Sequence, residues 1–368
     1  MRFSCAASEL QAALMVVTKA LASKSTLPVL EGVLVAANSE GLRLTCSDSS
    51  ITIVTELPAM VEEPGQIVLP GRLFTEVVRK MPSGEIHAEL RNGSVMTLKC
   101  MGSRTSITGM DATQFPKLPE VAGDNAITVP QPMLKDMIQR TSFANEVEDT
   151  RQVLTGCLLD VANGEARMVA LDGYRLAMRT ARVSDVDMKI SAIVPGKSLS
   201  ELGKLLSDDE DSRLTLCADK NMMHVTLPST EIYMRLIDGE FIDYRRILPN
   251  GWKSKVNVDC SQLKSCVDRA SLMAREGKNN LIKLDISGDD MVITSNSEIG
   301  DVHEELEVEH EGDDLLIAFN VKYIIDAVRA IDDEQVAMRF NSGVSPCVIA
   351  PLEGDSYLYL VLPVRINA

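Results

Sequence analysis

The feature that most constrains this fold is a threefold internal repeat. Similar strand and helix patterns recur at equal intervals along the 368 residues. Because each interval has the size of a domain, the repeats are expected to be whole domains and not turns of a solenoid. The equivalent positions are the turn residues Asp48, Asp172 and Asn296, the residues Pro70, Pro195 and Asn320, and the helix positions Leu10, Leu134 and Leu263.

The repeat predicts three tandem domains of about 120 residues, which is near the usual size of a domain that buries its own core. Two segments separate the repeats. One is the polar stretch 119–125, and the other is the segment 249–254, which contains Trp252, the single tryptophan of the chain. The predicted domains are therefore residues 1–122, 123–250 and 251–368.

Each repeat divides again into two similar halves, each made of a strand, a helix and a run of strands. In the first half, "MRFSCA" alternates as a strand, and apolar residues then recur with helical spacing at Leu10, Ala13, Leu14 and Val17. In the second half, "GQIVLP" leads into a helix predicted over 72–81. Strand runs with only two helices per repeat indicate an α+β fold with antiparallel sheets and helices on one side.

The composition bears on location and on partners. The formal net charge of −16 argues against a nucleic-acid partner at first sight, yet an acidic protein can still present one basic face. No apolar stretch reaches the roughly 18 residues that a membrane span needs. The first residues, "MRFSCAASEL", lack the apolar core of a signal peptide. The expected location is the cytoplasm, with no membrane contact.

The second helix of each repeat carries two cations seven positions apart. Seven residues are almost two helical turns, so each pair lies on one helix face. Ordinary i, i+4 ion pairs are an alternative explanation, because Glu76, Glu201 and Asp326 each follow the first cation by four positions. The six cations are Arg72, Arg79, Lys197, Lys204, Lys322 and Arg329.

Several motifs resemble the bacterial sliding clamps, the beta subunits of the replicative DNA polymerase. They are "TLPVL" at 26–30, "LDGYRLA" at 171–177, "IVPGK" at 193–197, "LIDGEFIDYRRILP" at 236–249 and "YLVLPVRINA" at 359–368. The resemblance covers the whole chain. It implies three clamp domains that form half of a six-domain ring. The ring would be a head-to-tail homodimer that encircles duplex DNA without sequence preference, with the helices lining the hole, and that tethers the polymerase for processive synthesis.

The resemblance also implies residues that contact DNA. Lys24, Arg72, Lys197 and the segment "DTRQVL" at 149–154 match such positions. This chain has Gln152 and Val153 where well-known relatives carry two aromatic residues. The predicted DNA-binding residues, with the other helix cations included, are Lys24, Arg72, Arg79, Arg151, Gln152, Lys197, Lys204, Lys322 and Arg329.

By the same resemblance, a groove between the second and third domains binds short linear peptides of the polymerase, the clamp loader and repair proteins. Arg175 and Arg246 are expected to supply its polar contacts. The matching positions are Leu154, Gly173, Tyr174, Arg175, Leu176, Ile242, Arg246, Ile247, Val344, Pro346, Val361, Leu362, Pro363, Val364, Arg365 and Ile366. For Leu154, Leu176 and Ile247, an ordinary place in the core is the alternative.

Ring closure would pair the first domain of one subunit with the third domain of the other. An exposed strand edge is a liability unless it is paired. The expected interface residues are Arg104, Thr105 and Ile107 on one side and Leu272 and Met273 on the other. Thr105 stands where relatives often carry a large apolar residue.

No catalytic group, cofactor or metal site is predicted. The four histidines lack metal-ligand spacing, and the eight cysteines include no C-x-x-C pair, so buried free thiols are expected. Two rival functions remain open from the residues alone. One is a metal-dependent nuclease that uses Asp172 of "LDGYR", and the other is a ring-shaped scaffold that binds peptides but never encircles DNA.

Overall fold

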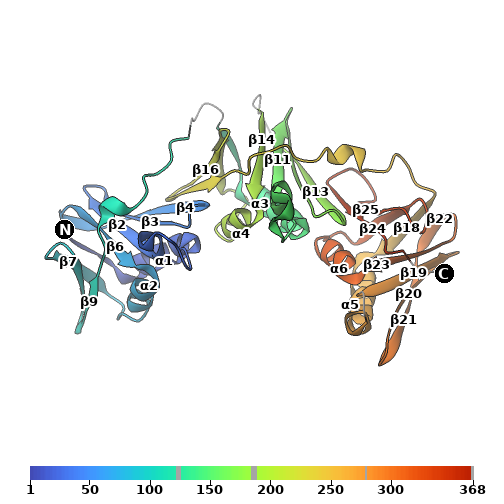
Figure 1. Cartoon of the computed structure of the whole chain (residues 1–368), viewed down its shortest axis with the longest axis horizontal. Helices are drawn as coiled ribbons and strands as arrows, with labels where there is room; N and C mark the ends of the chain where they lie inside the picture. Colours follow the sequence, from blue (N-terminus) through green and yellow to red (C-terminus); the bar gives the residue numbers. More distant parts are fainter. Residues whose placement is uncertain (122–125, 184–188, 278–279, 366–368) are drawn as a thin grey trace. The chain divides into compact units, whose positions relative to one another are not determined.

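The structure is a computed structural model that describes residues 1–121, 126–183, 189–277 and 280–365. The chain divides into two compact units, whose helices and strands carry their labels in Figure 1. Unit 1 contains Met1–Leu134 and Lys197–Leu236, and unit 2 contains Lys135–Gly196 and Ile237–Ala368. In the parts of the chain that are described, no helix is long and apolar enough to cross a membrane.

Unit 1 contains two antiparallel sheets, as the sequence predicted. The smaller sheet is, in spatial order, β5 (Met60–Glu63), β1 (Arg2–Ala6), β7 (Glu85–Arg91), β8 (Val95–Cys100) and β9 (Ser103–Thr108). The larger sheet is β10 (Ile127–Pro130), β15 (Arg213–Ala218), β16 (Met222–Leu227), β17 (Thr230–Arg235), β4 (Ile51–Leu57), β3 (Gly41–Ser47), β2 (Gly32–Asn38) and β6 (Gly65–Pro70).

Unit 2 is built in the same way. Its larger sheet is β14 (Ile190–Pro195), β11 (Gly156–Ala162), β12 (Glu165–Leu171), β13 (Arg175–Arg182), β26 (Tyr357–Val361), β25 (Cys347–Ala350), β24 (Gln335–Phe340), β18 (Ser254–Asp259) and β22 (Glu309–Gly312). Its smaller sheet is β21 (Gly300–Glu307), β20 (Asp290–Ser297), β19 (Leu281–Ser287) and β23 (Leu315–Asn320).

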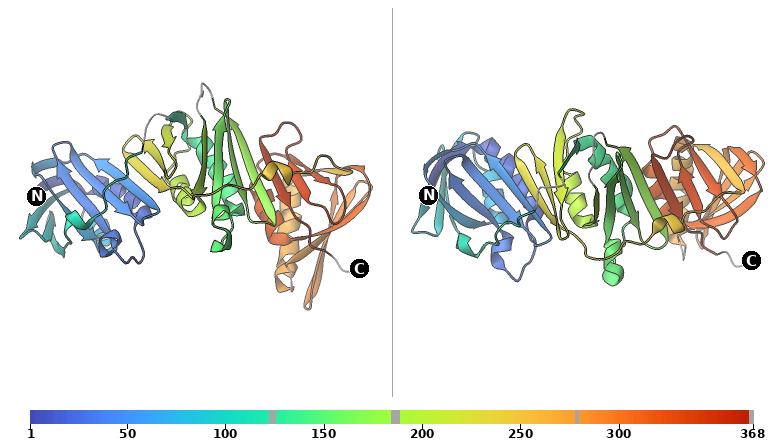
Figure 2. Two further views of the ribbon diagram at one scale, coloured as in Figure 1. Left: turned by 45° about the horizontal axis from the view of Figure 1, so that its top comes forward. Right: turned by 90° about the horizontal axis from the view of Figure 1, so that it is seen from above.

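The helices follow the predicted repeat. They are α1 (Ala7–Val17), α2 (Gly71–Arg79), α3 (Gln131–Thr141), α4 (Gly196–Gly203), α5 (Cys260–Glu276) and α6 (Val321–Arg329). Leu10, Leu134 and Leu263 each take the fourth position of a helix and are buried, which confirms their equivalence. The α2 helix ends at Arg79, two residues before the predicted end. Within unit 2, α5 packs on α6 and along β19, β20 and β21 (Figure 2).

One predicted correspondence is wrong by a residue. The Asp48 carboxylate accepts from the backbone N–H groups of Ser50 and Ile51, and the Asp172 carboxylate accepts from those of Tyr174 and Arg175. Asn296, however, lies inside β20, paired with a residue of β21. The neighbouring Ser297 is the turn residue, since its hydroxyl accepts from the backbone N–H of Ile299. The turn of the third repeat therefore lies one residue later than the predicted equivalence.

The other set of equivalent positions begins the second helices. Pro70 is the N-cap of α2, and α4 begins directly after Pro195. Asn320 is the N-cap of α6, and its side chain accepts from the backbone N–H of Lys322 at 3.0 Å. Asparagine is a favoured N-cap because its oxygen satisfies a free helix donor. Proline lacks that side-chain acceptor, so α2 begins without a side-chain cap.

Two pairs of strands join neighbouring repeats within the chain, and both pairs follow the same rule. In unit 1, β4 pairs with β17, and Ile53 lies opposite Ile232. In unit 2, β13 pairs with β26, and Ala177 lies opposite Tyr359. Each time, the last strand of a first half-repeat pairs with the last strand of the second half of the next repeat. The two remaining strands of these kinds, β21 and β9, lie at sheet edges.

Candidate functional site

The six cations of the second helices are all exposed, as the sequence predicted. On α2, Arg72 and Arg79 point away from Phe74 and Val78, which are fully buried. The same division of faces holds on α6, where Ile324 and Val328 are buried. These helices use one apolar face for packing and leave their cations in solvent.

The alternative explanation, i, i+4 ion pairs to the first cation, is wrong. The Glu76 carboxylate instead accepts from Arg79 at 2.6 Å, and Glu201 accepts from Lys204 at 2.7 Å. Asp326 bonds an arginine of another element, described below. The acidic residues therefore neutralise the second cation of α2 and α4 and leave the first cation to other partners.

Those partners are few. Arg72 donates to the carbonyl of Ser23 at 3.4 Å, and Lys197 reaches the Asp48 carboxylate at 3.0 Å. The Lys322 side chain has no hydrogen-bond or ion-pair partner among the described residues. Exposed single contacts of this kind contribute little to stability. The first cations therefore remain accessible to an anionic ligand.

The remaining predicted DNA-binding residues lie in exposed segments. Lys24 and Gln152 are exposed, and so is Arg151. Arg151 and Gln152 belong to the 3-10 segment Asp149–Thr155, in which Arg151 has the non-helical angles φ −134° and ψ 81°. Leu154 follows two positions after Gln152 and is fully buried, so this segment is fixed to the core directly beside the predicted DNA-binding residues.

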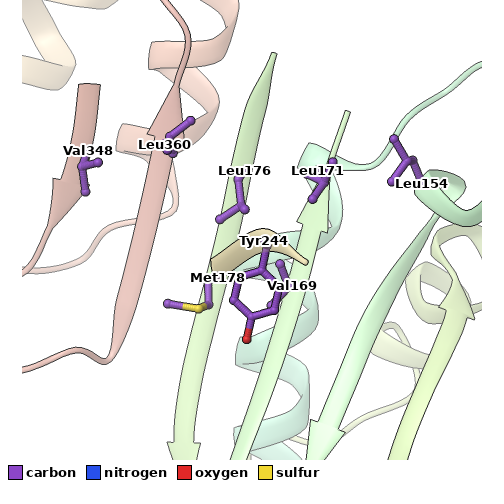
Figure 3. Close-up of a cluster of buried hydrophobic side chains, with 8 residues drawn as sticks. All are labelled: Leu154, Val169, Leu171, Leu176, Met178, Tyr244, Val348 and Leu360. Carbon is purple, nitrogen blue, oxygen red and sulfur yellow. The ribbon is translucent and has the colours of Figure 1, made fainter. Parts of the chain in front are cut away.

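Two of the predicted pocket residues belong to a buried cluster in unit 2 (Figure 3). Figure 3 shows Tyr244 lying over β12 and β13, beside Val169 and Met178. Leu176 and Leu154 are 3% and 0% exposed, so each is a core residue in this chain. The cluster is Leu154, Val169, Leu171, Leu176, Met178, Tyr244, Val348 and Leu360.

Other predicted pocket residues are exposed or half-buried apolar side chains, and Leu362 and Val364 among them belong to the C-terminal segment. Tyr174 is 60% exposed and Val344 is 69% exposed. The backbone N–H of Leu362 donates to Tyr174 at 2.8 Å, and that of Val364 donates to Ala318 at 2.8 Å. These two bonds fix the segment beside β13 and β23. We call Tyr174, Ile242, Ile247, Val344, Leu362 and Val364 the tail surface.

The remaining predicted pocket residues differ in how much of each side chain is exposed to solvent. Val361 is buried in the last strand, whereas Pro346 and Pro363 are half-buried. Arg246 and Arg365 are exposed, and within the described ranges Arg246 bonds only the neighbouring Asp243, at 3.0 Å. Ile366 lies outside the described residues.

Arg175 sits beneath the tail surface and is 7% exposed. Its Nε donates to Asp172 at 3.0 Å, its Nη1 donates to Asp326 at 2.5 Å, and its Nη2 donates to the carbonyl of Phe143 at 2.6 Å. The guanidinium also lies 4.7 Å from the ring centre of Tyr323. Every nitrogen of this side chain is therefore used to join β13, α6 and the segment after α3.

The residues predicted for a dimer interface lie on the edge strand β9 and on the helix α5. On β9, Arg104 is exposed and Thr105 is half-buried, whereas Ile107 is only 3% exposed within its own sheet. At the end of α5, Leu272 is exposed and Met273 is half-buried. The apolar surface at α5 is open, while Ile107 already belongs to the core.

Two exposed apolar residues, Ile299 and Leu316, and the half-buried Tyr323 were not among the predicted site residues. Ile299 lies at the tip of the β20–β21 hairpin, near Met273, and is 73% exposed. Tyr323 of α6 stacks on Tyr174 with 6.1 Å between the ring centres. Leu316 is exposed on β23. Tyr323 could have been found, because an aromatic residue directly after the first cation of the second helix breaks the pattern of the other repeats.

The cysteines, the metal-ligating side chains and Asp172 bear on the alternative nuclease function. All eight cysteines are buried free thiols, as predicted, and burial raises the pKa of Cys5 and of Cys157 to about 12, which makes their thiolates rare. Among the described residues, no group of three His, Cys, Asp or Glu side chains is arranged to hold a metal ion. Both Asp172 oxygens are already bonded, to Arg175 and to backbone N–H groups.

Comparison with known proteins accounts for nearly the whole chain. Residues 1–119 match the N-terminal domain of the DNA polymerase III beta subunit, residues 128–243 match its central domain, and residues 245–365 match its C-terminal domain. The beta sliding clamp of Staphylococcus aureus is 36% identical over 359 residues, which cover 94% of each chain.

Solved structures agree with this assignment. The DNA polymerase sliding clamp of Bacillus subtilis is 32% identical and superposes on all of both chains with a TM-score of 0.97. The DNA polymerase III beta subunit of Pseudomonas aeruginosa is 30% identical, again over all of both chains, with a TM-score of 0.93. The chain therefore belongs to the DNA polymerase III beta subunit family, the non-catalytic DNA sliding clamps, and consists of three clamp domains.

Proposed function

We propose that this sliding clamp works as a closed head-to-tail homodimer that encircles duplex DNA and tethers the replicative polymerase. The observation that carries the proposal is the pairing rule of the two strand pairs that join neighbouring repeats. That rule leaves β21 and β9 in each chain without a partner along their outer edge. In a dimer, β21 of each subunit can pair with β9 of the other. The two interfaces then use all four of these edges, and the ring is closed.

The rule also specifies a register. By their buried alternation, Ile53 and Ala177 correspond to Val302 on β21, while Ile232 and Tyr359 correspond to Thr105 on β9. Val302 of one subunit would then lie opposite Thr105 of the other. One residue further along, His303 would lie opposite Arg104, on the solvent side of the sheet, because alternate residues of a strand point to opposite faces.

A cysteine cross-link tests this arrangement. Arg104→Cys with His303→Cys places two exposed thiols on directly opposed residues, within disulfide reach. Oxidation is expected to give one covalent dimer band under non-reducing conditions. The native cysteines add little background, because all are buried. The matched control is Arg104→Cys with Val302→Cys, whose thiols lie on opposite faces.

Two outcomes count against the proposal. Equal cross-linking in both pairs contradicts the register, and a ladder of covalent oligomers contradicts the closed dimer.

A second experiment disrupts the interface with a charged substitution. Leu272 is the suitable apolar residue, because its side chain is exposed. A charge at the buried Ile107 would disturb the first domain itself, so a monomeric Ile107→Asp variant would say little about the interface.

For DNA, we propose that the exposed cations make sequence-independent phosphate contacts. Phosphate contacts hold a protein on the duplex without reading its bases, which suits sliding. The proposed contacts come from Lys24, Arg151 and Gln152 together with the six helix cations. The net charge of −16 is compatible with this function, since the first cation of each second helix is exposed and the acidic residues of these helices pair with other arginines and lysines.

For protein partners, we propose that the tail surface receives linear peptides of the polymerase, the clamp loader and repair proteins. Exposed apolar residues with a few polar neighbours mark such sites. Arg246 and Arg365 are the exposed cations nearest in sequence to its members. The division into domains 1–122, 123–250 and 251–368 and a cytoplasmic location belong to the same proposal.

A further inference from the structure

Arg151 is bonded to the turn that carries the tail surface. Its Nη2 donates to the backbone carbonyl of Asp172 at 2.8 Å and to the Glu146 carboxylate at 3.0 Å. The hydrogen bond from Arg151 lowers the pKa of the Glu146 carboxyl, so this carboxylate stays charged at neutral pH. A residue assigned to DNA contact by its motif therefore makes its described contacts at the other proposed site.

The backbone conformation of Gly173 and its lack of a side chain leave room for the Arg151 guanidinium. Its φ of +92° is a conformation that residues with a side chain rarely adopt. A Cβ at this position would lie 2.9 Å from Arg151 Nη2 and 3.0 Å from Nη1. The guanidinium thus rests directly on the glycine backbone, and any larger residue there would displace it.

The turn held in this way positions part of the tail surface. The Asp172 carboxylate accepts from the backbone N–H of Tyr174 at 2.9 Å and from that of Arg175 at 3.1 Å. The Tyr174 carbonyl in turn accepts from the backbone N–H of Leu362. Arg151 fixes the Asp172 carbonyl on one side of this turn, while the Arg175 guanidinium fixes its carboxylate on the other.

We propose that Arg151 is a positioning residue of the peptide site: it orders the 172–174 turn so that Tyr174 and Leu362 present a preformed surface to a peptide. This inference rests on the proposed peptide-binding function of the tail surface. Preforming a surface lowers the entropy lost when a ligand binds, so loss of the arginine weakens binding without removing a peptide contact.

The test compares Arg151→Ala, Arg151→Lys and the control Arg182→Ala, which removes an exposed arginine at the far end of β13. The probe is a fluorescein-labelled clamp-binding peptide of the host's replicative polymerase, titrated without DNA and followed by anisotropy. Arg151→Ala is expected to bind about three- to tenfold more weakly, the range for one lost hydrogen bond. Arg151→Lys is expected to recover most of the affinity, since its ammonium can still donate to the carbonyl.

A second readout separates positioning from general stability. Hydrogen exchange of the segment 171–177 is expected to be faster in Arg151→Ala, while the urea midpoint stays unchanged, because Arg151 is an exposed residue. Equal peptide affinity in the wild type and Arg151→Ala overturns the inference. If the wild type fails to bind the peptide, the proposed peptide site is wrong, and unchanged exchange at 171–177 then overturns the positioning role independently.

Discussion

Arg175 shows how burial decides what a charged side chain is free to do. The motif "LDGYRLA" assigns it to the peptide pocket, and the sequence suggests an outward polar contact. In the structure its three nitrogens bond Asp172, Asp326 and the Phe143 carbonyl. Only the bond to Asp172 could have been anticipated, since the other partners come from elements distant in sequence. We therefore propose that Arg175 contributes to the pocket by holding these elements together and not by contacting the peptide.

Arg175→Ala is therefore expected to lower the free energy of unfolding by about 2–4 kcal/mol. Removing one partner of a buried ion pair leaves the other charge without compensation, and here two carboxylates lose their partner. The control is Arg246→Ala, whose side chain is exposed and whose loss should cost less than about 0.5 kcal/mol. Urea unfolding measures both variants. Equal stability of Arg175→Ala and the wild type would show that the network is not a structural support.

At the scale of elements, the second helices divide between packing and charge as their sequences indicate. Periodicity was sufficient for this prediction, because burial of an amphipathic helix follows from its own residues. The ion pairs were not predictable from spacing alone. Glu76 and Glu201 each had a cation at i−4 and another at i+3, and the choice of the i+3 partner depends on side-chain rotamers.

Reversing the first cation of each helix, as Arg72→Glu, Lys197→Glu and Lys322→Glu together, should separate DNA binding from folding. The unfolding free energy should change by no more than about 1–2 kcal/mol, most of it from the new repulsion between position 197 and Asp48. DNA association should weaken, and its dependence on salt should flatten.

The matched control reverses three other exposed cations, Lys117, Arg213 and Lys220, for the same change in net charge. Filter binding over a range of salt concentrations compares the two triple variants. Equal loss in both would mean that overall charge, and not the helix faces, governs DNA association.

The C-terminal segment gives a second prediction at this scale. Deleting 362–368 removes the backbone bonds to Tyr174 and Ala318 but leaves the buried Val361 and the last strand intact. Peptide binding should be lost while the mass in solution remains that of the intact protein's assembly, since neither β9 nor β21 is touched. Anisotropy and light scattering measure the two properties. Undiminished binding by the truncated chain would place the partner site elsewhere.

At the scale of the whole molecule, the threefold repeat was readable because each copy keeps its own apolar periodicity. The one-residue error at Asn296 arose because the extra residue of the third repeat lies before this turn, while the turn itself, 297–300, keeps the length of 48–51 and 172–175. The strand pairing between repeats could not be predicted from the sequence, since the paired strands, β4 with β17 and β13 with β26, lie far apart along the chain. Those pairings are what single out β9 and β21 as the edges for ring closure.

The central claim, a closed ring around DNA, is tested most directly by topology. The Arg104→Cys, His303→Cys clamp is assembled on nicked circular DNA with its cognate loader and ATP, and is then oxidised to lock both interfaces. Gel filtration in high salt, which screens phosphate contacts, should show the locked clamp still on the circle, and cutting the DNA once should release it. A locked clamp that salt removes from intact circles, or that stays on the linear DNA, would contradict the account.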